Sequence, residues 1–208
     1  CLVDVEGADM PIASCATPVA NGMVVQTCTE RVQQMRLEAL KLLLVNHPLD
    51  CPVCDAGGEC QLQNRVYEFG IDKNAFPAEK RELPRGEFGT PLIRQWLDRC
   101  VMCLRCIQAC IDIPGADVLE VAAHGFLSHV KAARKESCIS CGECFHVCPV
   151  GALTENLSPI KGRIWQLNRI ETTCTFCGCV CDDMILKVQD DHIVEAKNAC
   201  VLGKAWSL

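Results

Sequence analysis

The sequence lacks a long apolar run, an excess of positive charge and any short repeat. Its best apolar stretch, 40–45, is interrupted by Lys41 and is far shorter than the roughly 18 residues of a membrane helix, so no membrane span is expected. The net charge of −6 argues against a nucleic-acid partner, because phosphate binding needs a basic face. Half of the residues are hydrophobic, which excludes disorder, and the lack of a repeat excludes low-complexity sequence.

The recognisable motifs of bond-making chemistry are also missing. The chain has no glycine-rich dinucleotide fingerprint, no nucleophile–base pair and no flavin motif. We therefore expect no complete catalytic site within these 208 residues. The first residue is Cys1, with no signal-peptide pattern behind it, and we interpret the chain as a piece of a longer polypeptide.

What the sequence has in abundance is cysteine, at 19 of 208 residues. This density indicates either a disulfide scaffold or a metal protein. The cysteines fall into tight blocks, and pairs three residues apart are poor disulfide partners because a bridge needs particular Cα separations and Cβ directions. Closely spaced thiols instead suit a metal centre, whose ligands must converge. The spacing favours metal.

Two runs carry the strongest pattern. The first run has the spacing C-x2-C-x2-C-x3-C, and the second run repeats it and adds Pro149. This is the two-cluster ferredoxin pattern, in which the fourth cysteine of each run ligates the other [4Fe-4S] cluster. One predicted ligand set is Cys100, Cys103, Cys106 and Cys148, and the other is Cys138, Cys141, Cys144 and Cys110. A structural zinc site is the alternative, but zinc predicts paired C-x2-C knuckles.

A third set lies upstream, just beyond a predicted helix. Thr27 and Glu30 have the spacing of a capping box, an apolar stripe follows (Val32, Met35, Leu40, Leu43 and Leu44), and Pro48 ends the pattern. The predicted ligands of a [4Fe-4S] cluster here are His47, Cys51, Cys54 and Cys60. An imidazole in place of one thiolate makes such a site less negative, which tends to raise its reduction potential.

A fourth set lies near the end of the chain. Residues 184–189 and 192–196 alternate around Asp190 and Asp191, which predicts a two-stranded hairpin. This hairpin would return the chain toward the preceding thiols, so Cys174, Cys177, Cys181 and Cys200 form the predicted ligand set of a further [4Fe-4S] cluster. Cys179 and Cys28 fit no set.

Cys1 and Cys15 are too few for a cluster of their own. Residues 2–7 read as a strand and a turn, and 23–27 as another strand. The two thiols are either half of a site whose other ligands precede Cys1, or buried cysteines without a metal.

In combination these motifs resemble the N-terminal iron–sulfur region of NAD-linked formate dehydrogenase large subunits and of the related NADH–quinone oxidoreductase subunit. The resemblance implies that Cys1 and Cys15 are the third and fourth ligands of a [2Fe-2S] cluster that is incomplete here. It also implies that the last block is the small lobe that opens molybdopterin or tungstopterin oxidoreductases, and its sequence is similar to formylmethanofuran dehydrogenase. Molybdopterin with Mo or W is then expected only downstream of Leu208.

The predicted fold is α+β, built from small iron–sulfur modules in series. We expect the end of a β-grasp [2Fe-2S] domain over 1–27, the histidine-ligated module over 28–68 and a linker over 69–91. The two-cluster ferredoxin is expected over 92–160 and the last [4Fe-4S] lobe over 161–208. Each module should be organised around its cluster more than around a large apolar core.

The leading hypothesis is an electron relay in a molybdo- or tungsto-oxidoreductase of the formate dehydrogenase type. It would join a pterin site in the remainder of the polypeptide to a diaphorase-type (flavin/NAD) or ferredoxin partner. One alternative is the iron–sulfur subunit of NADH–quinone oxidoreductase, and another is a structural zinc-binding interaction module. Free-thiol ligands favour a cytoplasmic location.

Overall fold

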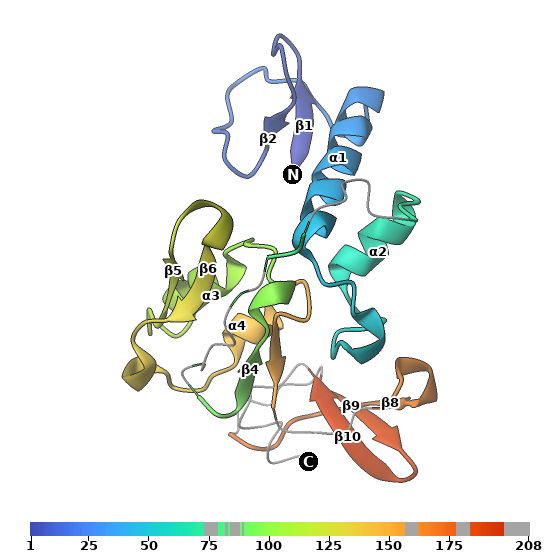
Figure 1. Cartoon of the computed structure of the whole chain (residues 1–208), viewed down its shortest axis with the longest axis vertical. Coiled ribbons are helices and arrows are strands. Elements are labelled where there is room, and N and C mark those ends of the chain that lie inside the picture. The colour runs from blue at the N-terminus through green and yellow to red at the C-terminus, as the bar shows by residue number, and fades with distance from the viewer. Residues whose placement is uncertain are drawn as a thin grey trace. The chain divides into compact units, whose positions relative to one another are not determined.

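The computed structural model describes residues 1–72, 79–81, 83, 88, 90–156, 162–177 and 184–197. It is a mixed structure of helices and short antiparallel strands, as the sequence predicts (Figure 1). The chain divides into two compact units, one of Cys1–Asn46 with Arg65–Lys80 and one of His47–Asn64 with Arg81–Leu208. Parts of the predicted linker 69–91 lie outside the described residues, as do Cys179, Cys181 and Cys200.

The first unit joins a small sheet to one long helix. Strand β1 (Leu2–Val5) lies between β2 (Ile12–Ala13) and β3 (Val25–Gln26), which confirms strands within the two predicted stretches. Helix α1 (Glu30–Asn46) follows and packs against β1. Arg36 Nη2 donates a hydrogen bond of 2.6 Å to the carbonyl of Leu2. The predicted stripe is buried at Val32 and Leu44, whereas Leu43 is exposed.

The predicted capping box at Thr27 and Glu30 is wrong, because α1 begins only at Glu30. Thr29 occupies the N-cap position: its carbonyl accepts the Gln33 N–H at 3.0 Å, and its hydroxyl accepts the Val32 N–H at 3.2 Å. The same hydroxyl donates to Asp4 in β1. One threonine therefore satisfies an N–H of the first helical turn and joins that turn to the sheet.

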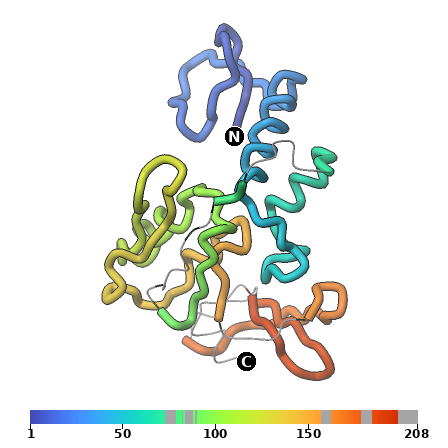
Figure 2. The backbone as a smooth tube through the Cα atoms, viewed as in Figure 1, coloured from blue at the N-terminus to red at the C-terminus, as the bar shows by residue number. Residues whose placement is uncertain are grey.

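In the second unit the elements alternate with the cysteine runs. Short helix α2 (Gln61–Glu68) begins in this unit. Strand β4 (Ile93–Gln95) pairs with β7 (Leu153–Glu155), and β5 (Leu119–Ala122) forms a hairpin with β6 (His129–Ala132). Helices α3 (Arg105–Asp112) and α4 (Glu143–His146) contact each other, which brings the green and golden segments of the tube together in Figure 2.

The core of this unit is built partly from thiols. Its buried members include Ile93, Val118, Leu119 and Val130, with Cys106, Cys110 and Cys144 among them. The Gln95 side chain is buried as well and donates a hydrogen bond of 2.8 Å to the carbonyl of Val130. The pairing of β4 with β7 joins the start and the end of the stretch that holds both runs.

The predicted hairpin near the end of the chain is confirmed. Strands β9 (Met184–Gln189) and β10 (His192–Lys197) pair antiparallel. Asp190 and Asp191 both have positive φ, 50° and 63°, as a type I′ turn requires. Strand β8 (Asn168–Thr172) adds a third strand beside β9, which the sequence did not predict.

A buried ion network joins this sheet to the loop before α2. Lys187 Nζ lies 2.8 Å from Glu59 and 2.8 Å from Glu195, and its side chain is only 4 % exposed. Lys197 also pairs with Glu59. Burial alone would raise the pKa of the Glu59 carboxyl, but hydrogen bonds from the two lysines outweigh it and lower that pKa. The contacts therefore stabilise the charged form of Glu59, and hydrogen bonds to Glu195 and Glu59 likewise raise the pKa of Lys187 against the effect of burial.

We predict that Thr29→Ala speeds amide hydrogen exchange in the first turn of α1 about fivefold, because loss of an N-cap costs about 1 kcal/mol. Exchange measured by mass spectrometry checks this. Thr27→Ala is the matched control, since the Thr27 hydroxyl precedes the helix and lies 3.5 Å from the Cys28 sulfur. Equal exchange in the two variants would contradict the assignment of the cap.

Lys187→Met should open the β8–β9–β10 sheet, because it removes the buried cation that lies 2.8 Å from both Glu59 and Glu195 and leaves only the more exposed Lys197 between them. Breaking a buried pair costs about 3–5 kcal/mol, so exchange in β9 should rise about 100-fold or more. In the control Lys131→Met, the exposed pair with Glu120 is lost, and the change should stay below about fivefold. Similar effects in both variants would show that burial adds nothing.

Candidate metal centres

The two cysteine runs adopt the same backbone path. In each run, the residues two and four positions after the first cysteine have left-handed φ: Met102 at 51° and Leu104 at 62°, then Ser140 at 57° and Gly142 at 84°. A short 3₁₀ turn precedes each run, at Leu97–Arg99 and Lys135–Ser137. Each third cysteine lies in the first turn of the following helix, α3 or α4. The repeated spacing is therefore also a repeated conformation.

Left-handed φ is costly for residues other than glycine. Met102, Leu104 and Ser140 adopt it, so each run contains a strained loop between its first and third cysteines. Such strain persists only where the surroundings determine the conformation. The loops therefore have the character of a ligand cradle.

The thiols of the first predicted set lie close enough to act on one another. Burial, together with the charges of Cys100, Cys148 and Cys103, raises the pKa of the Cys106 thiol to about 12. Cys148, the member from the second run, is held by its own hydrogen bond of 3.1 Å to the carbonyl of Val150. The structure thus brings the fourth cysteine of one run to the first three of the other.

The second predicted set is grouped in the same way. Burial raises the pKa of the Cys144 thiol, and the charge of Cys106, from the first set, adds to this ahead of those of Cys141, Cys110 and Cys138. The four cysteines of the second set also line one hollow, whose remaining walls are mostly apolar, including Ile93 and Val118. Thiols with raised pKa values must lose their protons to bind a metal, so loading of these sites is coupled to pH.

Within the described residues, no three histidine, cysteine or carboxylate side chains converge on a position for a single metal ion. A cubane cluster makes a different demand, since each of its four thiolates binds a different iron. The chemistry of the donors fits such clusters, since each set has four thiols. Cys106, Cys110 and Cys144 are buried in the apolar core, Cys103 is exposed, and the other four thiols are half-buried.

The third predicted set lies on the loop that follows α1. His47 is buried, Cys51 opens a 3₁₀ turn (Cys51–Val53), and Cys60 is buried immediately before α2. Burial raises the pKa of the Cys54 thiol, the N–H of Ala56 and the charge of Arg99 act against this, and the charge of Cys60 adds to it. The structure thus brings Cys54 and Cys60 together.

A short segment after Cys148 joins this loop to the first predicted set. The carbonyl of Pro149 accepts the Gln61 N–H at 3.0 Å, and the Cys60 thiol lies 3.7 Å from the same oxygen. A Cβ on Gly151 would lie 2.3 Å from the sulfur of Cys54, so only glycine fits there. The three residues that follow Cys148, a predicted ligand of one cluster, thus contact Cys54 and Cys60, which are predicted ligands of another cluster.

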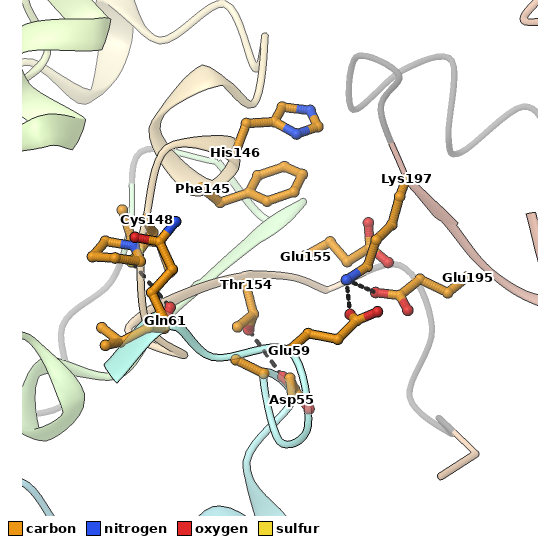
Figure 3. A pocket seen from close by; sticks show the side chains of 14 residues that line it. Asp55, Glu59, Gln61, Phe145, His146, Cys148, Thr154, Glu155, Glu195 and Lys197 are labelled. Atoms are coloured by element: carbon orange, nitrogen blue, oxygen red, sulfur yellow. Dashed lines mark hydrogen bonds and ion pairs between the residues drawn. The ribbon is translucent and has the colours of Figure 1, made fainter. Parts of the chain in front are cut away.

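The same region borders a cavity of about 280 Å³. Figure 3 shows Cys148, Phe145 and His146 along one part of its wall, and Glu59, Glu195 and Lys197 at another. The Phe145 and His146 rings stack with centroids 4.6 Å apart. Thr154 donates a hydrogen bond of 2.9 Å to Asp55, as drawn in Figure 3.

The other predicted ligands are only partly described. Cys174 is buried and Cys177 is exposed, while Cys181 and Cys200 lie outside the described residues. Cys1 and Cys15 are exposed thiols at one end of the β1–β2 pair, where the Ser14 N–H and hydroxyl both donate to the carbonyl of Cys1, each at 2.9 Å. All sixteen cysteines of the described residues are free thiols.

Sequence reasoning missed three charged residues of this region: Asp50, Glu59 and Arg99. Each directly precedes a predicted ligand, Cys51, Cys60 or Cys100, and each forms a long-range ion pair. Their position directly before a predicted ligand is the sequence signal that could have identified them.

Comparison with protein families identifies two regions. Residues 36–75 match the NADH-ubiquinone oxidoreductase-G iron-sulfur binding region. Residues 90–154 match the ferredoxin-like domain of NADH-quinone oxidoreductase subunit 3. The first match contains His47, Cys51, Cys54 and Cys60, and the second contains both cysteine runs.

Similar proteins extend the match over nearly the whole chain. A G-type subunit of NADH-quinone oxidoreductase from Rhizobium meliloti is 37 % identical over 98 % of this chain, and the alpha subunit of NADPH-Fe(3+) oxidoreductase from Geobacter sulfurreducens is 34 % identical over 98 %. The chain spans about a quarter of each of those proteins, 25 % in both cases.

A solved structure is similar as well. A chain in the crystal structure of NAD+-reducing [NiFe]-hydrogenase in the H2-reduced state superposes with a TM-score of 0.69 at 25 % identity, over 79 % of this chain and 71 % of that one. Among the described residues, no helix has the length and apolar character to cross a membrane.

The repeated cysteine loops, the two matched regions and the near full-length similarity lead to one conclusion. The chain carries iron–sulfur domains of the NADH–quinone oxidoreductase type and is an iron–sulfur electron-transfer region related to the G-type subunits of that enzyme.

Proposed function

We propose that this region carries electrons through four [4Fe-4S] clusters in series, with a [2Fe-2S] site at its N-terminal end. The single observation that carries the proposal is the repeated backbone path of the two cysteine runs, with left-handed φ at Met102 and Leu104 in the first and at Ser140 and Gly142 in the second. The shared spacing C-x2-C-x2-C-x3-C is the ferredoxin pattern, in which each run supplies its fourth cysteine to the other [4Fe-4S] cluster, whereas structural zinc favours paired C-x2-C knuckles. The influence of Cys148, as well as Cys100 and Cys103, on the Cys106 thiol supports this exchange.

In this proposal the chain supplies four groups of ligands. They are His47, Cys51, Cys54 and Cys60; Cys100, Cys103, Cys106 and Cys148; Cys138, Cys141, Cys144 and Cys110; and Cys174, Cys177, Cys181 and Cys200. Cys1 and Cys15 supply half of the [2Fe-2S] site. When bound, the clusters provide one-electron redox chemistry, while the protein sets their spacing, burial and hydrogen bonding.

The same scheme divides the chain into the modules 1–27, 28–68, 92–160 and 161–208, with 69–91 between the second and third. Contacts of Pro149 and Gly151 with the Cys54–Gln61 loop support a direct route between the histidine-ligated site and the nearer ferredoxin site. Protein between two carriers must be short and well packed for transfer, and this segment is both.

For the whole protein, we propose a relay of the formate dehydrogenase type that joins a molybdenum or tungsten pterin site to an NAD(H)- or ferredoxin-linked partner. The names of these relatives all involve a nicotinamide nucleotide, which supports a diaphorase-type partner. The alternative of a quinone-reductase subunit without a pterin metal also fits, since two of the relatives are NADH-quinone oxidoreductase subunits. Sixteen free thiols suit a reducing compartment, so we propose the cytoplasm.

Alanine variants of the full-length protein, purified without oxygen, test the ligand sets. Cys103→Ala and Cys148→Ala should each lose about four iron atoms, the content of one [4Fe-4S] cluster. The double variant should lose no more than either single variant, because both residues bind the same cluster. Iron and sulfide analysis with electron paramagnetic resonance (EPR) of the reduced protein measures this.

Cys28→Ala serves as the control, since Cys28 is an exposed thiol outside every set, and its iron content should be unchanged. Additive iron loss in the double variant would overturn the crossed assignment of ligands. Zinc in place of iron in the wild-type protein would overturn the proposed function and favour a structural interaction module.

A further inference from the structure

Arg99 is a buried cation between two predicted cluster loops. It directly precedes Cys100, and only 3 % of its surface is exposed. Its Nε donates to the two carboxylate oxygens of Asp50 at 3.1 and 3.2 Å, and its Nη2 donates to one of them at 2.5 Å. Asp50 directly precedes Cys51. This ion pair therefore joins the first cysteines of two ligand sets.

The two partners of the pair are in different environments. The Arg99 side chain is 3 % exposed, whereas that of Asp50 is 32 % exposed. Water screens the carboxylate more than it screens the guanidinium, so toward the interior the pair presents a net positive field. The guanidinium also lies over the Trp96 ring, 4.5 Å from its centroid. This contact fixes the plane of the guanidinium and of its fork of N–H donors.

One nitrogen of the guanidinium, Nη1, is an unpaired donor in the described part of the chain. Within the described residues, the Arg99 Nη1 atom is buried and has no hydrogen-bond partner. A buried donor left unpaired costs about 1–3 kcal/mol, and more when it carries charge. Native structures retain few such atoms, and one beside a ligand set points to an acceptor supplied by the bound group.

The neighbours of Arg99 identify which site this is. Its charge acts on the thiol of Cys54, in the set of His47. The cation that acts on the Cys100 thiol is a different one, Arg81, whose guanidinium donates to the carbonyl of Cys100 at 3.4 Å. Although Arg99 is next to Cys100 in sequence, it faces the other loop.

We propose that Arg99 sets the reduction potential of the cluster held by His47, Cys51, Cys54 and Cys60, with Nη1 donating a hydrogen bond to one of its sulfur atoms. This inference rests on the proposed function. Reduction adds one electron, and so one negative charge, to the group in this site. A buried positive charge and a hydrogen bond to sulfur both stabilise the more negative state, so both raise the potential.

Potentiometric titration of the full-length protein, followed by EPR of this cluster, tests the proposal. Arg99→Gln removes the charge and should lower the midpoint potential. Asp50→Asn removes the opposing negative charge while keeping an acceptor for the fork, and should raise it. Arg99→Lys keeps the charge without the fork and should lie between wild type and Arg99→Gln.

Arg94→Gln is the matched control. The Arg94 guanidinium lies 6.0 Å from the centroid of the same Trp96 ring, but the side chain is 39 % exposed, its ion pair with Asp55 is long at 4.0 Å, and it donates a hydrogen bond of 2.5 Å to the neutral side chain of Asn156. Its removal should leave the midpoint potential unchanged, because an exposed charge is well screened. A shift as large as that of Arg99→Gln would overturn the proposal that the buried position matters.

Two further results would overturn the inference. One is an unchanged potential in Arg99→Gln with the cluster intact. The other is a shift of the same sign in Arg99→Gln and Asp50→Asn, which indicates a loosened loop and no effect of charge. If Arg99→Gln loses the iron of this site, the opposite shifts expected for Arg99→Lys and Asp50→Asn decide the matter. A wild-type protein without this cluster refutes the proposed function itself, and the role of Arg99 with it.

Discussion

The burial of thiols that must become thiolates is the constraint on which the larger unit depends. Cys106, Cys110 and Cys144 occupy core positions that large apolar side chains fill in ordinary domains. Among the described residues of this unit, the largest side chain that is fully buried is only a valine, Val118. Protonated thiols that lie this close together stabilise the fold little, and the negative charges of neighbouring thiolates repel one another. We expect bound iron to remove both difficulties, and therefore expect metal binding and folding to be coupled in this unit.

Charged residues also occupy positions directly before predicted ligands. Asp50, Glu59 and Arg99 each precede a ligand, and each forms a buried or half-buried ion pair that reaches a distant segment. A ligand loop has little apolar surface of its own, so charge pairs in a water-poor setting hold it in place. Because the pairs contact the loops directly, the same residues that position the ligands also set the local field around them.

Local patterns in the sequence predicted most of the local structure. The spacing of the two runs indicated matching loops, and the structure has matching left-handed positions at Met102 and Ser140. The hairpin around Asp190 and the helix that ends before Pro48 are also present. The cap of that helix was misplaced by two residues, because Thr27 has the capping-box spacing with Glu30, whereas Thr29 is fixed at the cap partly by a long-range contact with Asp4 that no local pattern shows.

Partners far apart in the chain were beyond local reasoning. Arg99 and Asp50 are 49 residues apart, and Lys197 and Glu59 are 138 apart. Neither charge periodicity nor spacing specifies such pairs, since any acidic and basic residue would fit the pattern equally well. The pairing of β4 with β7 and the addition of β8 to the sheet could not be predicted for the same reason, because both depend on contacts between distant segments. The ligand spacing was predictable because a cluster is a local template, whereas the junctions between loops depend on the whole fold.

The most direct test of this account is a metal count on the native, full-length protein purified without oxygen. The region described above predicts about 16 iron atoms from four cubanes, or slightly more with a completed [2Fe-2S] site, and a similar amount of sulfide. One molybdenum or tungsten atom per chain in addition would support the formate dehydrogenase type, and neither would favour a quinone-reductase relay. Zinc in place of iron would contradict the central claim that these thiols bind iron–sulfur clusters that carry electrons.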